Sequence, residues 1–254
     1  MTMYRTRFNN ETRWPQNLEN ELVLEAGCGP GALTPFPIER GATVISLDLS
    51  SSVDQARQIV KEGPRNLFVQ ASMFAMPFKP GTFDRCYCFG VIQHTPDPAQ
   101  AFAELVKVLR PGGHLAADSY IRPDPKLGGG HKLIRAKYRF RRLGLNRLPP
   151  RLLHSIIRAY VAAIFPIHRK VSAQPARVEM LRSFMLDDYS ARLTGMDKHR
   201  HKEFAVLDIF DFLSPAYDFP QSVDEFKDLF AKHGLTDIDV HPGYNGIEGR
   251  GRKA

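Results

Sequence analysis

The sequence predicts an α/β fold with an open, mainly parallel sheet. One observation is that short apolar runs of strand length alternate along the chain with longer segments of helical periodicity. The other is that the first run ends in a glycine-rich turn, Gly27 to Gly31, and the second in Asp48, seventeen residues after Gly31. Because the carboxyl ends of parallel strands share one edge of a sheet, we expect both groups at a ligand-binding edge.

Seven strands and four helices are expected in the part of the chain that follows this alternation. The expected strands are 21–26, 43–48, 66–71, 84–90, 113–120, 235–241 and 246–252. The expected helices are 36–41, 52–62, 97–110 and 223–233, with a short turn at 73–76.

Proline and glycine predict the helix boundaries. Asp97 beside Pro98 opens the third helix, because proline fits the first helical position. Gly234 ends the fourth. Pro35 and Pro37 predict that the first helix starts late or kinks, because proline beyond the first turn removes an amide donor.

Residues 121–204 break the alternation, and we expect them to form a helical insertion in a core made of 1–120 and 205–254. From Lys126 to Arg177 there are thirteen Lys or Arg and no Asp or Glu, whereas the whole chain carries +8. An insertion after the fifth strand lies at the ligand edge, so this one is expected to form a basic cap that favours an anionic substrate. Its expected helices are 131–143, 150–165 and 176–190.

Composition excludes several classes of protein. With 254 residues, 43% of them hydrophobic, the chain can bury the core of one α/β domain with an insertion. The segment Met1 to Asn20 is polar and unlike a signal peptide, and no run approaches the ~20 apolar residues that span a bilayer, so we expect a cytoplasmic protein. Cys28, Cys86 and Cys88 are expected to be small buried thiols, and no metal site is expected.

The glycine turn indicates a nucleoside ligand. Glycines at every second position let the backbone approach a ligand closely, and a carboxylate at Asp48 suits ribose hydroxyls. Gly27, Gly29 and Ala32 also match the loose dinucleotide pattern, which is weak by itself. Glu25, just before the loop, would repel a pyrophosphate but could help to hold a cationic ligand. The turn therefore favours S-adenosylmethionine (SAM) over NAD.

Further motifs follow in order along the chain. They are Ser72-Met73, Met76-Pro77-Phe78 ahead of Phe83-Asp84, Gly90-Val91-Ile92-Gln93-His94-Thr95, and Leu109-Arg110-Pro111-Gly112-Gly113. At these residues the chain resembles class I SAM-dependent methyltransferases of the small-molecule, ubiquinone/menaquinone-biosynthesis-like group, over 14–120 and 205–253. The resemblance implies a Rossmann-like seven-stranded methyltransferase sheet with helices on both faces, SAM as cofactor and S-adenosyl-L-homocysteine as product.

The same resemblance implies roles for individual residues. The glycines would approach the methionine tail and Glu25 would order their loop; Asp48 would anchor the ribose. Ser72 stands where relatives often carry an aspartate, which weakens the expected contact to the adenine amino group. The full implied cofactor set is Glu25, Gly27, Gly29, Gly31, Asp48, Leu49 (against the adenine), Ser72 and Met73 (at the adenine edge), and Gly90, Val91 and Gln93 (near the ammonium).

His94 is the candidate catalytic base. Methyl transfer needs an aligned nucleophile and exclusion of water, and an oxygen or nitrogen nucleophile usually also needs a proton acceptor. His94 follows the tip of the fourth strand, and its unperturbed pKa of ~6.5 suits this work. The alternative is that it bonds the loop before Pro96 or only shapes the pocket. Tyr217 and Tyr244 could offer hydroxyls to a substrate, or be purely structural.

The expected function is SAM-dependent methylation of a small, anionic biosynthetic intermediate. Transfer to oxygen is favoured, with a sugar or natural product as acceptor. One alternative is N- or C-methylation of a natural-product intermediate. Another is a SAM-binding scaffold that no longer catalyses, which would tolerate loss of His94. The sequence predicts no oligomeric state.

The basic block allows other interpretations besides a cap for an anionic substrate. It could be a solvated face. Nucleic acid is disfavoured because aromatics are sparse and no recognition module is present. Peripheral membrane contact is possible, because apolar pairs recur at helical spacing beside Arg151 and Arg158; such a stripe is more often buried in a core. The pairs are Leu152-Leu153, Ile156-Ile157, Tyr160-Val161 and Ile164-Phe165.

Overall fold

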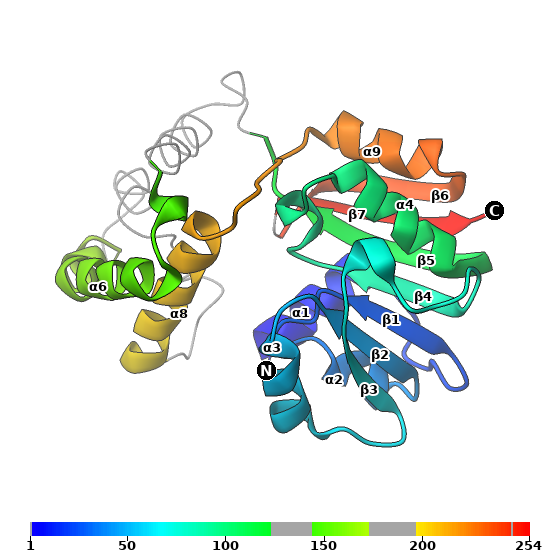
Figure 1. Cartoon of the computed structure of the whole chain (residues 1–254), viewed down its shortest axis with the longest axis horizontal. Helices are drawn as coiled ribbons and strands as arrows, with labels where there is room; N and C mark the ends of the chain where they lie inside the picture. Colours follow the sequence, from blue (N-terminus) through cyan, green and yellow to red (C-terminus); the bar gives the residue numbers. More distant parts are fainter. Residues whose placement is uncertain (1, 123–143, 173–196, 245) are drawn as a thin grey trace. The chain divides into compact units, whose positions relative to one another are not determined.

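The computed structural model describes residues 2–122, 144–172, 197–244 and 246–254, and the chain divides into two compact units (Figure 1). The first unit contains Met1–Arg122 and Tyr217–Ala254, and the second contains Pro123–Ala216. The second unit runs to Ala216, whereas the sequence analysis ends the insertion at 204.

A seven-stranded sheet forms the centre of the first unit, in the order β3-β2-β1-β4-β5-β7-β6. The strands are β1 Leu22–Ala26, β2 Thr43–Asp48, β3 Asn66–Gln70, β4 Phe83–Cys88, β5 Leu109–Ser119, β6 Leu235–Gly243 and β7 Gly246–Lys253. Strands β1 to β5 pair in parallel, whereas β7 lies between β5 and β6 and is antiparallel to both. The predicted seven-stranded α/β fold is confirmed.

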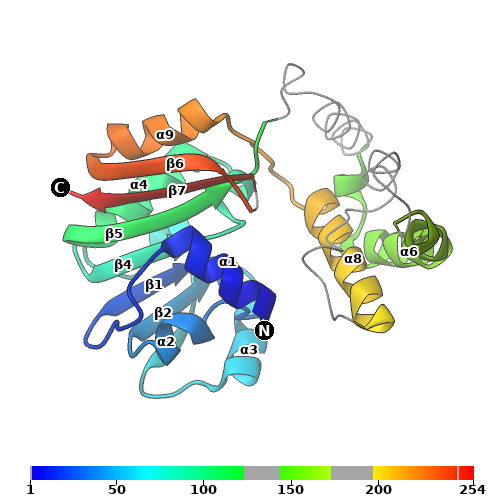
Figure 2. The ribbon, with the colours of Figure 1, turned by 180° about the vertical axis from the view of Figure 1, so that it is seen from behind.

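Helices cover both faces of the sheet (Figures 1 and 2). Helices α4 and α9 pack on one face, and α1 and α2 on the other. Helix α3 lies on the same face of the sheet as α1 and α2. Its apolar side packs on Phe68 of β3, which pairs with Ser46 of β2, and Ser46 in turn pairs with Glu25 of β1, so these three side chains are on one face. The helices of this unit are α1 Thr2–Thr12, α2 Pro35–Glu39, α3 Ser52–Ala56, α4 Pro98–Val108 and α9 Val223–Lys232, with short helical turns η1 Arg57–Lys61, η2 Met73–Ala75 and η3 Ile92–His94.

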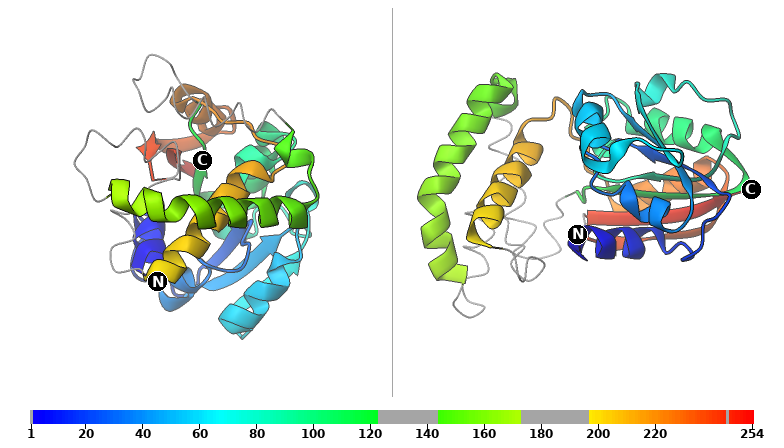
Figure 3. Two further views of the ribbon diagram at one scale, coloured as in Figure 1. Left: turned by 90° about the vertical axis from the view of Figure 1, so that its left-hand side faces the viewer. Right: turned by 90° about the horizontal axis from the view of Figure 1, so that it is seen from below.

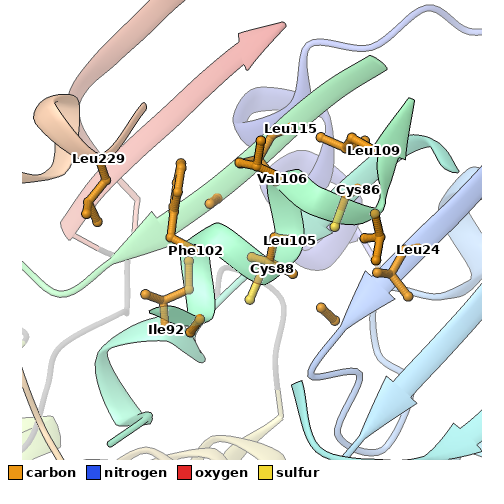
Figure 4. Close-up of a cluster of buried hydrophobic side chains, with 14 of the residues drawn as sticks. Leu24, Cys86, Cys88, Ile92, Phe102, Leu105, Val106, Leu109, Leu115 and Leu229 are labelled. Carbon is orange, nitrogen blue, oxygen red and sulfur yellow. The ribbon is translucent and has the colours of Figure 1, made fainter. Parts of the chain in front are cut away.

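Strand alternation divides the core into two layers. Leu24, Cys86 and Leu115 pair across β1, β4 and β5, and all face α4. Figure 4 shows this layer, where Phe102 of α4 packs beside Leu229 of α9. The three cysteines are buried, as expected.

The N-terminal helix α1 was not expected from the sequence. Its Phe8 is fully buried and packs against Trp14, Phe36 and Tyr87, with ring centroids 5.4–5.9 Å apart. Arg250 of β7 donates to the carbonyl oxygens of Asn10 and Glu11, at 3.1 Å each. The first helix is therefore held by the last strand.

Helix α2 is a single short turn. Pro35 occupies its start, where a missing amide hydrogen costs nothing, and the helix begins one residue before the expected range of 36–41. It ends at Glu39, before Gly41, whose φ of +95° no longer continues a helix. Phe36 and Pro37 are buried, so this turn contributes packing close to the glycine loop.

The second unit contains a helix pair (Figure 3). The described elements are η5 Leu145–Arg147, α6 Pro150–Ser172 and α8 Lys198–Leu213. Their shared core is Leu153, Ile157, Val161, Phe165, Ala205 and Val206. The expected helices 131–143 and 176–190 lie outside the described residues. Among the helices that are described, none combines the length and the apolar character needed to cross a bilayer.

Candidate functional site

The glycine loop lies at the carboxyl edge of the sheet. It leaves β1 after Ala26, and Gly27 N and Cys28 N both donate to the carbonyl oxygen of Leu47, at 2.7 and 3.0 Å. These bonds tie the loop to the end of β2. The edge predicted from the two strand ends is therefore assembled as expected.

Asp48 organises this edge with both carboxylate oxygens. One oxygen accepts from Gly29 N at 2.7 Å, and the other accepts from the backbone and the hydroxyl of Ser50, at 2.8 and 2.7 Å. The carboxylate therefore connects the middle of the glycine loop to the turn after β2. A ligand lying across both segments would meet Asp48 first.

Glu25 lies under the loop and is fully enclosed. Its Oε2 accepts from Thr34 Oγ1 at 2.5 Å and from Ser46 Oγ at 2.7 Å. Burial raises the pKa of Glu25 to about 7, although these hydrogen bonds act to lower it. The carboxylate is therefore bonded to Thr34, just before α2, and to Ser46 of β2.

The three glycines of the loop have positive φ but different surroundings. A Cβ on Gly27 (φ +81°) would lie 2.2 Å from Val91 Cγ2, so this glycine lets the loop pack on the chain after β4. A Cβ on Gly31 would lie 2.9 Å from Val60 Cγ2. At Gly29 (φ +51°) a Cβ would meet nothing within 4 Å. Gly29 thus has open space on the side where a ligand could approach.

The segment Gly90 to His94 forms the neighbouring part of the edge. Gly90 N donates to the buried carboxylate of Asp118 at the end of β5, which also accepts from Arg7 of α1 at 2.6 Å. Gln93 is fully buried, yet neither its amide nitrogen nor its amide oxygen has a hydrogen-bond partner. Because such groups are nearly always satisfied in proteins, this amide marks a position for a polar ligand or water.

His94 is held by residues that follow the second unit in sequence. Its Nδ1 lies 3.1 Å from the carbonyl oxygen of Tyr217 and 3.8 Å from the carboxylate of Asp218, whose side chain is 3% exposed. Its ring packs edge-on against Tyr120, with centroids 5.2 Å apart. Its Nε2 is buried and has no hydrogen-bond partner. His94 therefore contacts Tyr217 and Asp218, from the chain that returns after the insertion.

The other predicted cofactor residues have distinct surroundings. Leu49, directly after Asp48, is 71% exposed. Ser72 Oγ accepts from Phe74 N at 3.2 Å and so caps η2. Met73 points into the core beside α4, so its side chain does not line the edge.

The two predicted substrate tyrosines lie in separate places. Tyr217 stacks on Phe219, and it is the carbonyl oxygen rather than the hydroxyl that contacts His94. Tyr244 follows β6, and the guanidinium of Arg7 lies 5.6 Å from its ring centroid.

Two carboxylates at the edge were missed by the sequence analysis. Asp118 ends a strand predicted at 113–120, so the argument that selected Asp48 could have found it. Asp218 carries no such signal, because its contact with His94 joins residues more than one hundred positions apart. Across the described ranges, no group of three or more His, Cys, Asp or Glu side chains gathers in the way a metal site requires.

Residues 24–117 match the family described as a methyltransferase domain. Over 107 residues the chain is 36% identical to a ubiquinone biosynthesis O-methyltransferase of Thiobacillus denitrificans, covering 41% of this chain and 45% of that one. Over 94 residues it is 36% identical to a malonyl-[acyl-carrier protein] O-methyltransferase of Pseudescherichia vulneris, covering 37% of each. The chain thus spans less than half the length of these curated relatives.

A solved structure of a SAM-dependent methyltransferase from Methanosarcina mazei resembles the whole chain. The TM-score is 0.53, at 14% sequence identity over 97% of this chain and 96% of that one. At this identity the likeness shows a shared fold. It supports the seven-stranded arrangement independently of the local sequence match.

Proposed function

We propose that residues 24–117, which match the methyltransferase-domain family, form a class I SAM-dependent methyltransferase domain, and that the protein transfers a methyl group from SAM to a small-molecule acceptor. The observation that carries the proposal is that Asp48 bonds to Gly29 while Gly27 of the same loop packs against Val91 of the Gly90–His94 segment, at one edge of the sheet. S-adenosyl-L-homocysteine would be the product.

The residues at this edge fit SAM. Gly29 leaves room for a ligand at the loop, and the exposed Leu49 offers an apolar surface to a purine. The unsatisfied amide of Gln93 offers both a donor and an acceptor to a polar tail. SAM itself supplies a methyl group already activated by the sulfonium.

His94 is the group proposed to receive the acceptor's proton. A backbone carbonyl can only accept, so the contact with Tyr217 O requires the proton of neutral His94 to sit on Nδ1. Nε2 is then the free base, and it is buried without a partner. The carboxylate of Asp218 nearby would stabilise the imidazolium after proton transfer. A hydroxyl acceptor is favoured because the curated relatives named above are O-methyltransferases.

The proposed acceptor is anionic. Between Lys126 and Arg177 the chain has thirteen basic residues and no acidic one, so a second unit acting as cap would attract negative charge.

Calorimetric titration of SAM and S-adenosyl-L-homocysteine tests the proposal. We expect binding that Asp48→Ala weakens by about 2 kcal/mol, or about thirtyfold in Kd, as for hydrogen bonds to a charged group. Asp54→Ala, an exposed carboxylate on α3, is the matched control and should leave Kd unchanged. Absence of binding by the unaltered protein, with thermal unfolding still cooperative, would refute the proposed function.

A further inference from the structure

Helix α6 carries two apolar faces. One face is buried against α8 and supplies most of the core of the second unit. The other, which we call the apolar row, faces outward. It consists of Leu152, Ile156, Tyr160 and Ile167, which are 48, 45, 41 and 50% exposed. The helix pair therefore forms its core without the apolar row.

The apolar row is continuous along the helix. At about 100° per residue, its four members and the exposed Ala159 and Ala163 fall within an arc about 100° wide that contains no charged residue among the described side chains. Arg151 and Arg158 follow one another seven residues apart on one side of the helix, between the row and the buried face. Long arginine side chains can reach past the apolar arc while keeping their charge in water.

The charged side chains described on α6 are Arg151 and Arg158, and both are basic. In the sequence, the stretch from Lys126 to Arg177, which includes all of α6, has thirteen basic residues and no acidic one. Arg158 contacts Glu203 of α8 at 3.3 Å, but both side chains are exposed, so the pair is weak. A soluble anion would be attracted by the cations alone and would gain nothing from an exposed row of aliphatic side chains. An anionic lipid surface matches both features.

We propose that the apolar row of α6, with Arg151 and Arg158 beside it, docks the protein on an anionic lipid membrane. The row enters the boundary between head groups and acyl chains, and the arginines contact lipid phosphates. Since no described helix is suited to crossing the bilayer, this contact lies in the interface. The docking is a property of the second unit and does not depend on methyl transfer.

Flotation of the full chain with lipid vesicles tests the docking. We expect binding to phosphatidylcholine vesicles that contain phosphatidylglycerol, little binding to phosphatidylcholine alone, and loss of binding as salt rises. Leu152→Ser/Ile156→Ser should lower the bound fraction about tenfold or more. The matched control is Ile59→Ser/Leu207→Ser, which also removes one exposed isoleucine and one exposed leucine, and it should bind as the unaltered protein does.

A second variant measures the contribution of the two arginines to vesicle binding separately from that of the apolar row. Arg151→Gln/Arg158→Gln should weaken vesicle binding and flatten its dependence on salt. Thermal unfolding and affinity for S-adenosyl-L-homocysteine should be unchanged in all variants, so a failed cofactor site is distinguished from failed docking. If the row variant instead melts at a clearly lower temperature, the row is part of the protein's own interior and the docking proposal is wrong.

Other outcomes would also overturn the docking proposal. These are no binding to either vesicle, equal binding to both, or binding that the row variant leaves intact. Binding of single-stranded RNA that is tighter than vesicle binding and unaffected by Leu152→Ser/Ile156→Ser would assign the basic stretch to nucleic acid instead.

Discussion

Glu25 illustrates how burial changes the chemistry of one side chain in the candidate site. Its pKa is raised from 4.5 to about 7 because the surrounding protein excludes water from the carboxylate. Between these two values the folded state binds more protons than the unfolded state. The stability that protonated Glu25 contributes is therefore fully present below pH 4.5 and is lost as the pH rises through 7.

Glu25→Gln should remove this dependence, because glutamine resembles the protonated acid and cannot ionise. We expect the free energy of unfolding of the variant, relative to the unaltered protein, to rise by about 3 kcal/mol between pH 5 and pH 8. Urea unfolding at the two pH values measures the change. The exposed Glu19→Gln is the control, and a difference that stays constant with pH would contradict the expectation.

The tautomer of His94 gives a second test at the scale of one residue. Because Tyr217 O is an acceptor, we expect neutral His94 to carry its proton on Nδ1. Long-range proton–nitrogen NMR of histidine-labelled protein distinguishes the tautomers, and His94→Gln identifies the signal. Asp218→Asn should leave the tautomer in place, because the bond to the Tyr217 carbonyl is kept. An Nε2–H signal would show that the contact to Tyr217 is absent in solution.

At the scale of elements, the glycine loop packs closely against the chain after β4, with Gly27 against Val91. Gly27→Ala should cost about 2 kcal/mol or more, since it combines a left-handed backbone with a Cβ 2.2 Å from Val91. Gly29→Ala carries only the backbone strain and should cost about 1 kcal/mol. Urea unfolding of both variants measures the difference. Val91→Ala, added to Gly27→Ala, should restore part of the loss; equal losses at the two glycines would contradict this packing.

The strands were predictable because each is a compact signal in the sequence. β2 matches its expected range, and β1 and β3 differ from theirs by one residue at one end. Helix α1 was not predictable, because its polar sequence has no apolar periodicity and buries Phe8 alone among its aromatics. It is held by partners distant in sequence, such as Arg250 and Asp118, which no local pattern reveals.

The residues of the candidate site also differ in whether the sequence predicted their contacts. Asp48 and the glycine loop follow strand ends, so their meeting was expected from the order of the strands. The partners of His94 come from the chain that returns after the insertion, where the sequence offers no strand or cap to mark the contact. Which residue of a returning loop reaches His94 depends on tertiary packing, so the contacts of the Tyr217 carbonyl and the Asp218 carboxylate were not predicted from the sequence.

At the scale of the whole molecule, the first unit is expected to fold without the second. Its core clusters contain only its own residues, and the outgoing and returning chains pair, with Arg122 N donating to Gln221 O at 2.7 Å. Replacing 123–216 by about ten Gly and Ser residues spans this junction easily. We expect cooperative urea unfolding and retained affinity for S-adenosyl-L-homocysteine, with vesicle binding lost. A shortened protein that unfolds without cooperativity would contradict the independence of the first unit.

The position of β7 between β5 and β6 determines when this protein can finish folding during its synthesis. β6 is made before β7 yet has no partner in the sheet until β7 arrives. From the end of β5 at Ser119 to the end of β7 at Lys253, a ribosome needs on the order of ten seconds. Throughout that time the edge of β5 is unpaired, and α1 lacks its anchor at Arg250. The sheet is therefore complete only when both β6 and β7 have been synthesised.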